Sequence, residues 1–154
     1  MARIQIREGD WFAVPLRSSG FGAVLVARAN PEGVLLGYFF RPRSERLPSL
    51  DGLRNLGLAS AVLVAKFGHL GITSGAWPLL GRLDGWDRLR WPMPVFGRLE
   101  ELSGRAFRVF YNNDDPNGWL RDEPTSINDA LQLPRDRLLG AGAAEIVLTK
   151  LLAS

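Results

Sequence analysis

Cysteine is absent from the chain, and histidine occurs only once, at position 69. The lack of cysteine excludes disulfide bonds, thiolate catalysis and zinc sites built on sulfur. A single imidazole cannot form a cluster of histidines around a metal ion, and a Ser-His-Asp triad would have to be built around His69. The glycines form neither a GxGxxG nor a GxxxxGK[ST] pattern. These absences predict a protein that binds a partner, uses no metal or cofactor, and is not an enzyme.

Long apolar runs are also missing. The longest, residues 58–67, is interrupted by Ser60 and Lys66 and is far shorter than the ~20 residues of a membrane helix. Residues 1–8 contain no apolar stretch of signal-peptide length. We therefore expect a cytoplasmic protein that has no membrane partner.

Length and charge point to an ordinary globular domain. The 154 residues fit one domain, expected to span 1–154, and a chain of this size buries about 70% of its unfolded surface. The net charge is +3, and 17 of the 19 basic residues are arginines, spread from Arg3 to Arg137. Proteins that bind nucleic acid usually gather such charge on one face, so this scatter argues against a nucleic-acid partner.

Apolar runs separated by turn residues predict a β-rich fold. An Asn30-Pro31-Glu32-Gly33 turn separates two of the expected strands, and a helical pattern after Pro134 predicts a terminal helix over residues 134–152. Loops are expected at 41–57, with a helical turn at 49–56, and at 84–92 and 112–123. Strands are expected at residues 11–16, 21–29, 33–40, 61–67, 77–83, 94–99 and 106–111.

These elements predict an α+β fold. Its sheet is expected to be curved, antiparallel and barrel-like, with about seven strands and a C-terminal helix. Two small packed sheets are the alternative arrangement.

Few residues are candidates for catalysis. His69 could act as a general base, because its free pKa lies near neutrality, or it could be an exposed histidine in a turn. Paired carboxylates could hydrolyse glycosides or bind calcium, or they could simply be solvated turn residues. None of the pairs has the spacing of a calcium-binding loop; they are Asp84/Asp87, Glu100/Glu101, Asp114/Asp115 and Asp122/Glu123.

The five tryptophans divide into two sets. Trp11 and Trp77 begin predicted strands and are expected in the core. Trp86, Trp91 and Trp119 lie in predicted loops, where a tryptophan either folds back onto the core or is presented to a partner. The sequence favours neither alternative for these three side chains.

Several segments resemble the immunity protein 26 family. The most specific is GDWFAVPL at residues 9–16, followed by a strand that begins Phe21-Gly22. The others are VLLGYFF at 34–40, LDGWDRLRWPMPVF at 83–96 and YNNDDP at 111–116. The resemblance covers most of residues 9–116. It implies a role in a bacterial toxin–immunity system, as a stoichiometric inhibitor that binds a cognate toxin domain.

The resemblance also suggests how binding would occur. Many such toxins cut nucleic acid with a basic cleft, and an inhibitor of a nuclease can place carboxylates where phosphates would lie. Tryptophans would anchor the interface. A net charge of +3 leaves room only for a local acidic patch. The residues expected to bind the partner are Asp84, Trp86, Asp87, Trp91, Asp114, Asp115, Trp119, Asp122 and Glu123.

Two other hypotheses remain open from the sequence. A nucleic-acid-binding barrel would need aromatic and basic side chains on one sheet face, and its best local candidates are Phe39, Phe40, Arg41 and Arg43. A small hydrolase would use His69 together with Asp84 or Asp87 in a shared pocket.

Overall fold

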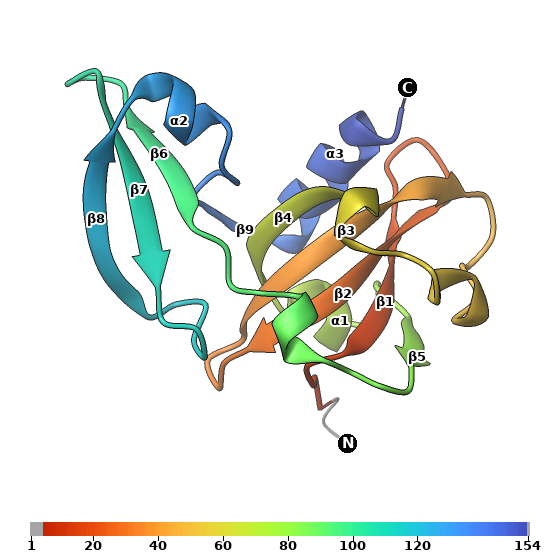
Figure 1. Cartoon of the computed structure of the whole chain (residues 1–154). Coiled ribbons are helices and arrows are strands. Elements are labelled where there is room, and N and C mark those ends of the chain that lie inside the picture. Colours follow the sequence, from red (N-terminus) through yellow and green to blue (C-terminus); the bar gives the residue numbers. More distant parts are fainter. Residues whose placement is uncertain (1–4, 154) are drawn as a thin grey trace.

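The computed structural model describes residues 5–153, which form two β-sheets and several short helices (Figure 1). The six-stranded sheet has the order β5-β1-β2-β3-β4-β9, and the three-stranded sheet has the order β6-β7-β8. The strands are β1 (Asp10–Pro15), β2 (Phe21–Ala29), β3 (Val34–Ser44), β4 (Ala61–Gly68), β5 (Leu79–Arg82), β6 (Phe96–Glu100), β7 (Arg105–Tyr111), β8 (Trp119–Thr125) and β9 (Leu138–Leu139).

The helices are short and connect or flank the strands. The α-helices are α1 (Leu70–Thr73), α2 (Ile127–Leu131) and α3 (Ala141–Leu151). Single turns of 3₁₀ helix occur at η1 (Asp51–Leu53), η2 (Leu58–Ser60) and η3 (Arg88–Arg90). Ser126 caps α2, because its side chain accepts a hydrogen bond from the amide of Asp129.

Strands β1 to β4 form an antiparallel meander. β5 adds to one edge in antiparallel orientation, and β9 pairs with the other edge, β4, in parallel. The Asn30–Gly33 turn joins β2 to β3, with Gly33 at a φ of 86°, a backbone conformation that suits glycine. The antiparallel strands predicted at residues 11–16, 21–29 and 33–40 are therefore found in the structure, with small shifts at their ends.

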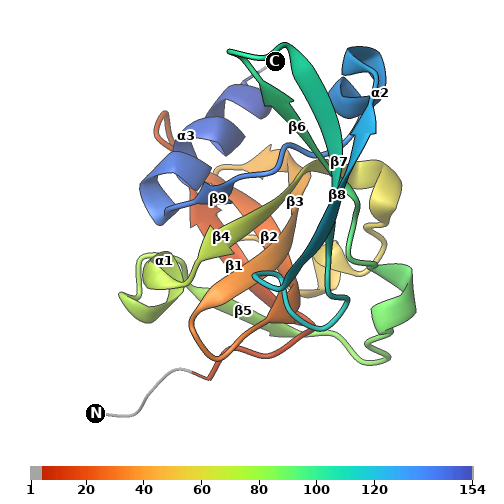
Figure 2. The ribbon, with the colours of Figure 1, turned by 90° about the vertical axis from the view of Figure 1, so that its left-hand side faces the viewer.

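The six-stranded sheet is the middle layer of the molecule, because its strands are buried on both faces (Figure 2). Alternate residues point to opposite sides, as in any strand. One face packs against α3 in a core cluster of Phe12, Val24, Phe39, Phe67, Trp77 and Leu148. The other face packs against the three-stranded sheet and the segment around η3 in a second cluster, which contains Trp11, Leu25, Tyr38, Phe40, Trp91, Phe96 and Val109.

The structure corrects the predicted barrel. Neither sheet closes or curls strongly, and the described residues contain nine strands in two sheets rather than about seven in one. The α+β class and the C-terminal helix are confirmed. The alternative of two packed sheets describes the arrangement better, although one sheet has six strands.

Several local predictions were also wrong. The expected loop at 41–57 begins later, because β3 continues to Ser44. The expected loop at 112–123 ends at residue 118, and β8 follows it. The C-terminal helix begins at Ala141 instead of Pro134, because Arg135 pairs with Gly97 and β9 pairs with β4. The helices α1 and α2 were not predicted. The expected strand at 77–83 is shorter, since β5 spans only Leu79–Arg82.

Candidate docking face

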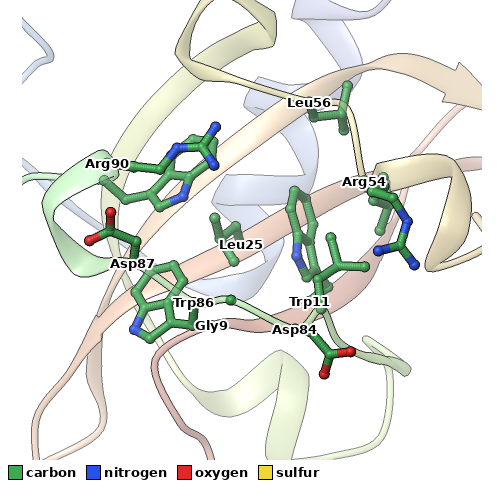
Figure 3. A pocket seen from close by; sticks show the side chains of 13 residues that line it. Gly9, Trp11, Leu25, Arg54, Leu56, Asp84, Trp86, Asp87 and Arg90 are labelled. Atoms are coloured by element: carbon green, nitrogen blue, oxygen red, sulfur yellow. The ribbon is translucent and has the colours of Figure 1, made fainter.

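A small pocket collects four of the predicted contact residues, Asp84, Trp86, Asp87 and Trp91 (Figure 3). It lies where the segment that connects β5 to η3 crosses over β1 and β2. Its volume is about 100 Å³. Leu25 of β2 and Trp11 of β1 also line it, and Arg54, next to η1, lies on the opposite side.

The size of this pocket limits what it can hold. Pockets for small-molecule ligands usually measure about 300–1,000 Å³. A space of about 100 Å³ suits a single side chain of another protein better than a substrate or cofactor. The walls combine indole rings, which are enriched at the cores of protein–protein interfaces, with charged groups of the kind that surround such cores.

The tryptophans around the pocket differ in exposure. Trp91 is only 7% exposed and packs edge-on against Tyr38 and Phe40, with ring centroids 5.2 and 5.6 Å away. Of the two alternatives left open by the sequence, Trp91 therefore folds back onto the core and offers little surface to a partner. Trp11 is also buried, as expected, whereas Trp86 is partly exposed.

Arg88 connects the pocket segment to the turn between β7 and β8. Its Nε and Nη2 donate to the two carboxylate oxygens of Glu8, at 2.9 and 3.1 Å, and its Nη1 donates to Asp114. The hydrogen bond to Asp114, followed by those to Glu8, raises the pKa of Arg88. The Asp114 carboxylate remains 75% exposed, so it can still accept a hydrogen bond from a partner.

Asp115 has a structural position. Its Oδ1 accepts a hydrogen bond from Nδ2 of Asn30, at 3.0 Å, and one from the amide of Asn117, at 2.8 Å. These bonds attach the β7–β8 turn to the β2–β3 turn. Because one carboxylate oxygen already serves both turns, Asp115 is less available to a partner than Asp114.

The remaining predicted residues lie on β8, on the three-stranded sheet. Trp119 is 58% exposed, and its Nε1 donates to Asp122 at 2.7 Å. Arg98 of β6 also donates to Asp122, at 2.6 Å. The hydrogen bond from Arg98, assisted by that from Trp119, lowers the pKa of Asp122. Glu123 pairs with its neighbour on β8, Arg121, at 3.1 Å.

Internal ion pairs thus neutralise half of the proposed acidic surface. Asp114, Asp122 and Glu123 each have an arginine partner. Between residues 5 and 153, Asp84 and Asp87 have none. Asp115 also lacks an ion pair in this part of the chain, but it is bonded to Asn30, so Asp84 and Asp87 are the two carboxylates of this set that bond to no other segment among the described residues.

The geometry does not support the hydrolase hypothesis. His69 is exposed, and its ring lies against Gly33 in the β2–β3 turn. Among the residues the structure describes, no hydrogen bond joins its imidazole to Asp84 or Asp87, and it does not line their pocket. In the same part of the chain, no group of three or more carboxylates and imidazoles converges to hold a metal ion.

The geometry also argues against the alternative of a nucleic-acid-binding barrel. Phe39 and Phe40 are 0% and 1% exposed, so neither ring can stack on a nucleotide. Arg43 is occupied as well, since its Nε donates to the carbonyl of Ser19 at 3.0 Å.

One residue of this region was missed by sequence reasoning. Leu89, in η3, is 88% exposed, and it lies between Arg88 and Arg90. A leucine in a loop is normally expected to turn inward, and only its position between two arginines indicated otherwise. Asp87 caps this turn of helix, because its Oδ1 accepts from the amide of Leu89 at 3.0 Å.

No helix within residues 5–153 has the length and apolar character needed to cross a bilayer. Neither a curated protein nor a solved structure matches the chain. A family model described as immunity protein 26 matches residues 7–108.

This match includes the six-stranded sheet up to β5, the pocket and η3. It ends before the 111–116 stretch, so that part of the resemblance lies outside it. Immunity proteins of this kind are inhibitors rather than enzymes. Because the match covers more than half of the chain, the chain belongs to the immunity protein 26 family and is an immunity protein of a polymorphic toxin system, which neutralises a cognate toxin.

Proposed function

We propose that the chain neutralises its toxin by stoichiometric, non-covalent binding in the cytoplasm. We further propose that the toxin docks on the loop face, defined as residues 84–90 and 112–119. The observation that carries this proposal is the position of Leu89, an almost fully exposed apolar side chain between two arginines, one of which, Arg88, is fixed by Glu8 and Asp114. An ordered apolar side chain that is exposed to solvent favours binding, because a partner can bury it without first having to order it.

Apolar and aromatic side chains would supply most of the binding free energy. Hot spots of interfaces are enriched in tryptophan and surrounded by polar contacts that exclude water. On the loop face, Leu89 and Trp119 are 88% and 58% exposed, and Trp86 is partly exposed beside the pocket. The charged groups around them would form the polar rim.

The electrostatic contribution is expected to be small. Asp84 and Asp87 are the two carboxylates of the loop face that could meet a basic cleft, such as that of a nuclease, without first breaking a bond to an arginine or to another segment. Full mimicry of a phosphate backbone would need more free carboxylates than these. We therefore expect association at an ordinary rate of about 10⁵–10⁶ M⁻¹s⁻¹, with a shallow dependence on salt.

The docking face is tested by calorimetric titration of the cognate toxin domain. Leu89→Ala should weaken binding by at least tenfold, since truncating a hot-spot residue costs more than about 1 kcal/mol. Leu102→Ala is the matched control, because Leu102 is a fully exposed leucine on the β6–β7 turn, outside the loop face. Equal affinities for the two variants would show that the toxin binds elsewhere.

The stoichiometric mechanism has its own test. Toxin activity should fall in proportion to added immunity protein and reach its minimum at a 1:1 ratio. An inhibitor that acts catalytically would abolish activity at a small fraction of that ratio. Complete protection at substoichiometric amounts would therefore contradict the proposed mechanism, whatever the location of the contact surface.

A further inference from the structure

Arg28, on β2, is a charged residue buried behind the loop face. Its side chain is only 1% exposed, yet no carboxylate contacts it among the described residues. Burial is the main cause that lowers the pKa of Arg28, and the nearby charge of Arg88 adds to it. A buried charge is normally paired with an opposite charge. The position of Arg28 therefore requires another explanation.

The guanidinium of Arg28 bonds only to neutral oxygen atoms. Nε donates to the carbonyl of Asn113 at 2.6 Å, and Nη2 donates to the side-chain oxygen of the same residue at 3.1 Å. Nη1 donates to the carbonyls of Ala27, at 2.6 Å, and Trp91, at 3.1 Å. A planar guanidinium can satisfy several acceptors in fixed directions at once, which a lysine cannot do.

These bonds connect Arg28 to both segments of the loop face on their buried side. Trp91 immediately follows η3, and Asn113 lies in the β7–β8 turn beside Asp114. The two acceptors are 63 and 85 residues from Arg28 in the sequence. Arg88 makes a second link between the same two segments at the surface, through Asp114. Two arginines thus link the two segments of the loop face: Arg28 on the buried side and Arg88 at the surface.

We propose that Arg28 is a positioning residue, which holds residues 84–90 and 112–119 in the arrangement that the toxin binds. This inference rests on the proposed docking face. A surface that is already ordered loses less conformational entropy on binding. If only a tenth of the molecules have the two segments correctly placed, the apparent affinity falls tenfold.

The test compares Arg28→Met with Lys66→Met. Lys66 on β4 is also a buried cation, but it bonds to Asp136 and lies over the ring of Tyr111, and none of its described contacts involves residues 84–90 or 112–119. Arg28→Met should lower the association rate and the affinity for the cognate toxin domain by about tenfold. It should also accelerate amide exchange at residues 88–91 and 113–118. Lys66→Met should change neither quantity, even if both variants lose similar stability.

Two results would overturn the proposal. One is a folded Arg28→Met protein with unchanged exchange at the loop face, a result that needs no toxin at all. The other is accelerated exchange together with unchanged toxin affinity, while Leu89→Ala still weakens binding. If Leu89→Ala has no effect either, the docking face itself is misplaced, which is a separate failure.

A second variant keeps the test decisive if Arg28→Met does not fold. Asn113→Ala removes only the bond between Nη2 and the side-chain oxygen, at an exposed position. We expect it to weaken toxin binding about threefold and to accelerate exchange in the same turn. An unchanged affinity for this folded variant would refute the role of Arg28.

Discussion

Replacing Asp136 by alanine should remove bonds that join the two sheets and thereby lower the free energy of unfolding. Its Oδ1 accepts hydrogen bonds from Nζ of Lys66 on β4 and from the hydroxyl of Tyr111 on β7, both at 2.7 Å. The ammonium of Lys66 also lies 3.7 Å from the centre of the Tyr111 ring. One carboxylate in the segment before β9 therefore connects both sheets.

The expected loss follows from what the substitution leaves behind. Lys66 and Asp136 have side chains that are 8% and 12% exposed, so the alanine variant would leave a nearly buried ammonium without its counter-charge. Breaking a buried pair in this way costs about 3–5 kcal/mol. We take the lower figure, about 3 kcal/mol, because Tyr111 still offers its ring to the cation. For a domain of this length the melting temperature should fall by about 6–12 °C.

Urea denaturation measures this effect when wild type is compared with Asp136→Ala, the double variant Asp136→Ala/Lys66→Met and Asp51→Ala. Asp136→Ala should lower the unfolding free energy by about 3 kcal/mol. Adding Lys66→Met should recover part of the loss, since the unpaired charge is then gone. Asp51→Ala is the control, because it breaks the exposed pair with Arg54 and should have little effect. A loss below about 1 kcal/mol for Asp136→Ala would refute the reasoning about the buried pair.

Three further predictions concern packing and titration. Gly97→Ala should destabilise the fold by about 1–3 kcal/mol in thermal denaturation, because a Cβ there would overlap the backbone of α2; wild-type stability would contradict the close packing. The pKa of Asp122 is lowered mainly by Arg98, so its contribution to stability is present above about pH 4 and is lost as acid protonates it. The melting temperatures of wild type and Asp122→Asn should therefore converge on acidification. Burial raises the pKa of Tyr38 to about 12 and also raises that of Tyr111, so absorbance at 295 nm should show no tyrosine titrating near pH 10 until unfolding begins.

The sequence predicted the central meander well because its signals are local. β1 to β4 consist of apolar runs, and the turn between β2 and β3 contains proline and glycine at suitable positions. The strand β8 was missed because Trp119–Thr125 contains Arg121, Asp122, Glu123 and Pro124, residues typical of loops. Pairing with β7 makes it a strand, and no local pattern reports that partner.

Long-range pairing also explains the wrong start of the terminal helix. Leu138 and Leu139 fit the helical spacing, but they pair instead with Lys66 and Phe67 of β4. The same limitation applies to the barrel, since the edges β5 and β9 are far apart in strand order and do not meet.

The candidate site was predictable as a region but not in its chemistry. Residues 84–91 stood out by their tryptophans and aspartates, and the structure places four of them around one pocket. The arginine partners of Asp114 and Asp122 lie 26 and 24 residues away in the sequence and could not be assigned from it. Leu89 carried no signal beyond its charged neighbours.

The parallel pairing of β9 with β4 has a consequence for synthesis of the protein. About 70 residues separate Phe67 from Leu139, so a nascent chain completes its first four strands long before β9 leaves the ribosome. During that interval the part of the β4 edge at Lys66 and Phe67 lacks its partner strand. An unpaired strand edge can pair with another chain, so slow translation between these positions would lengthen the time in which this edge is open to aggregation.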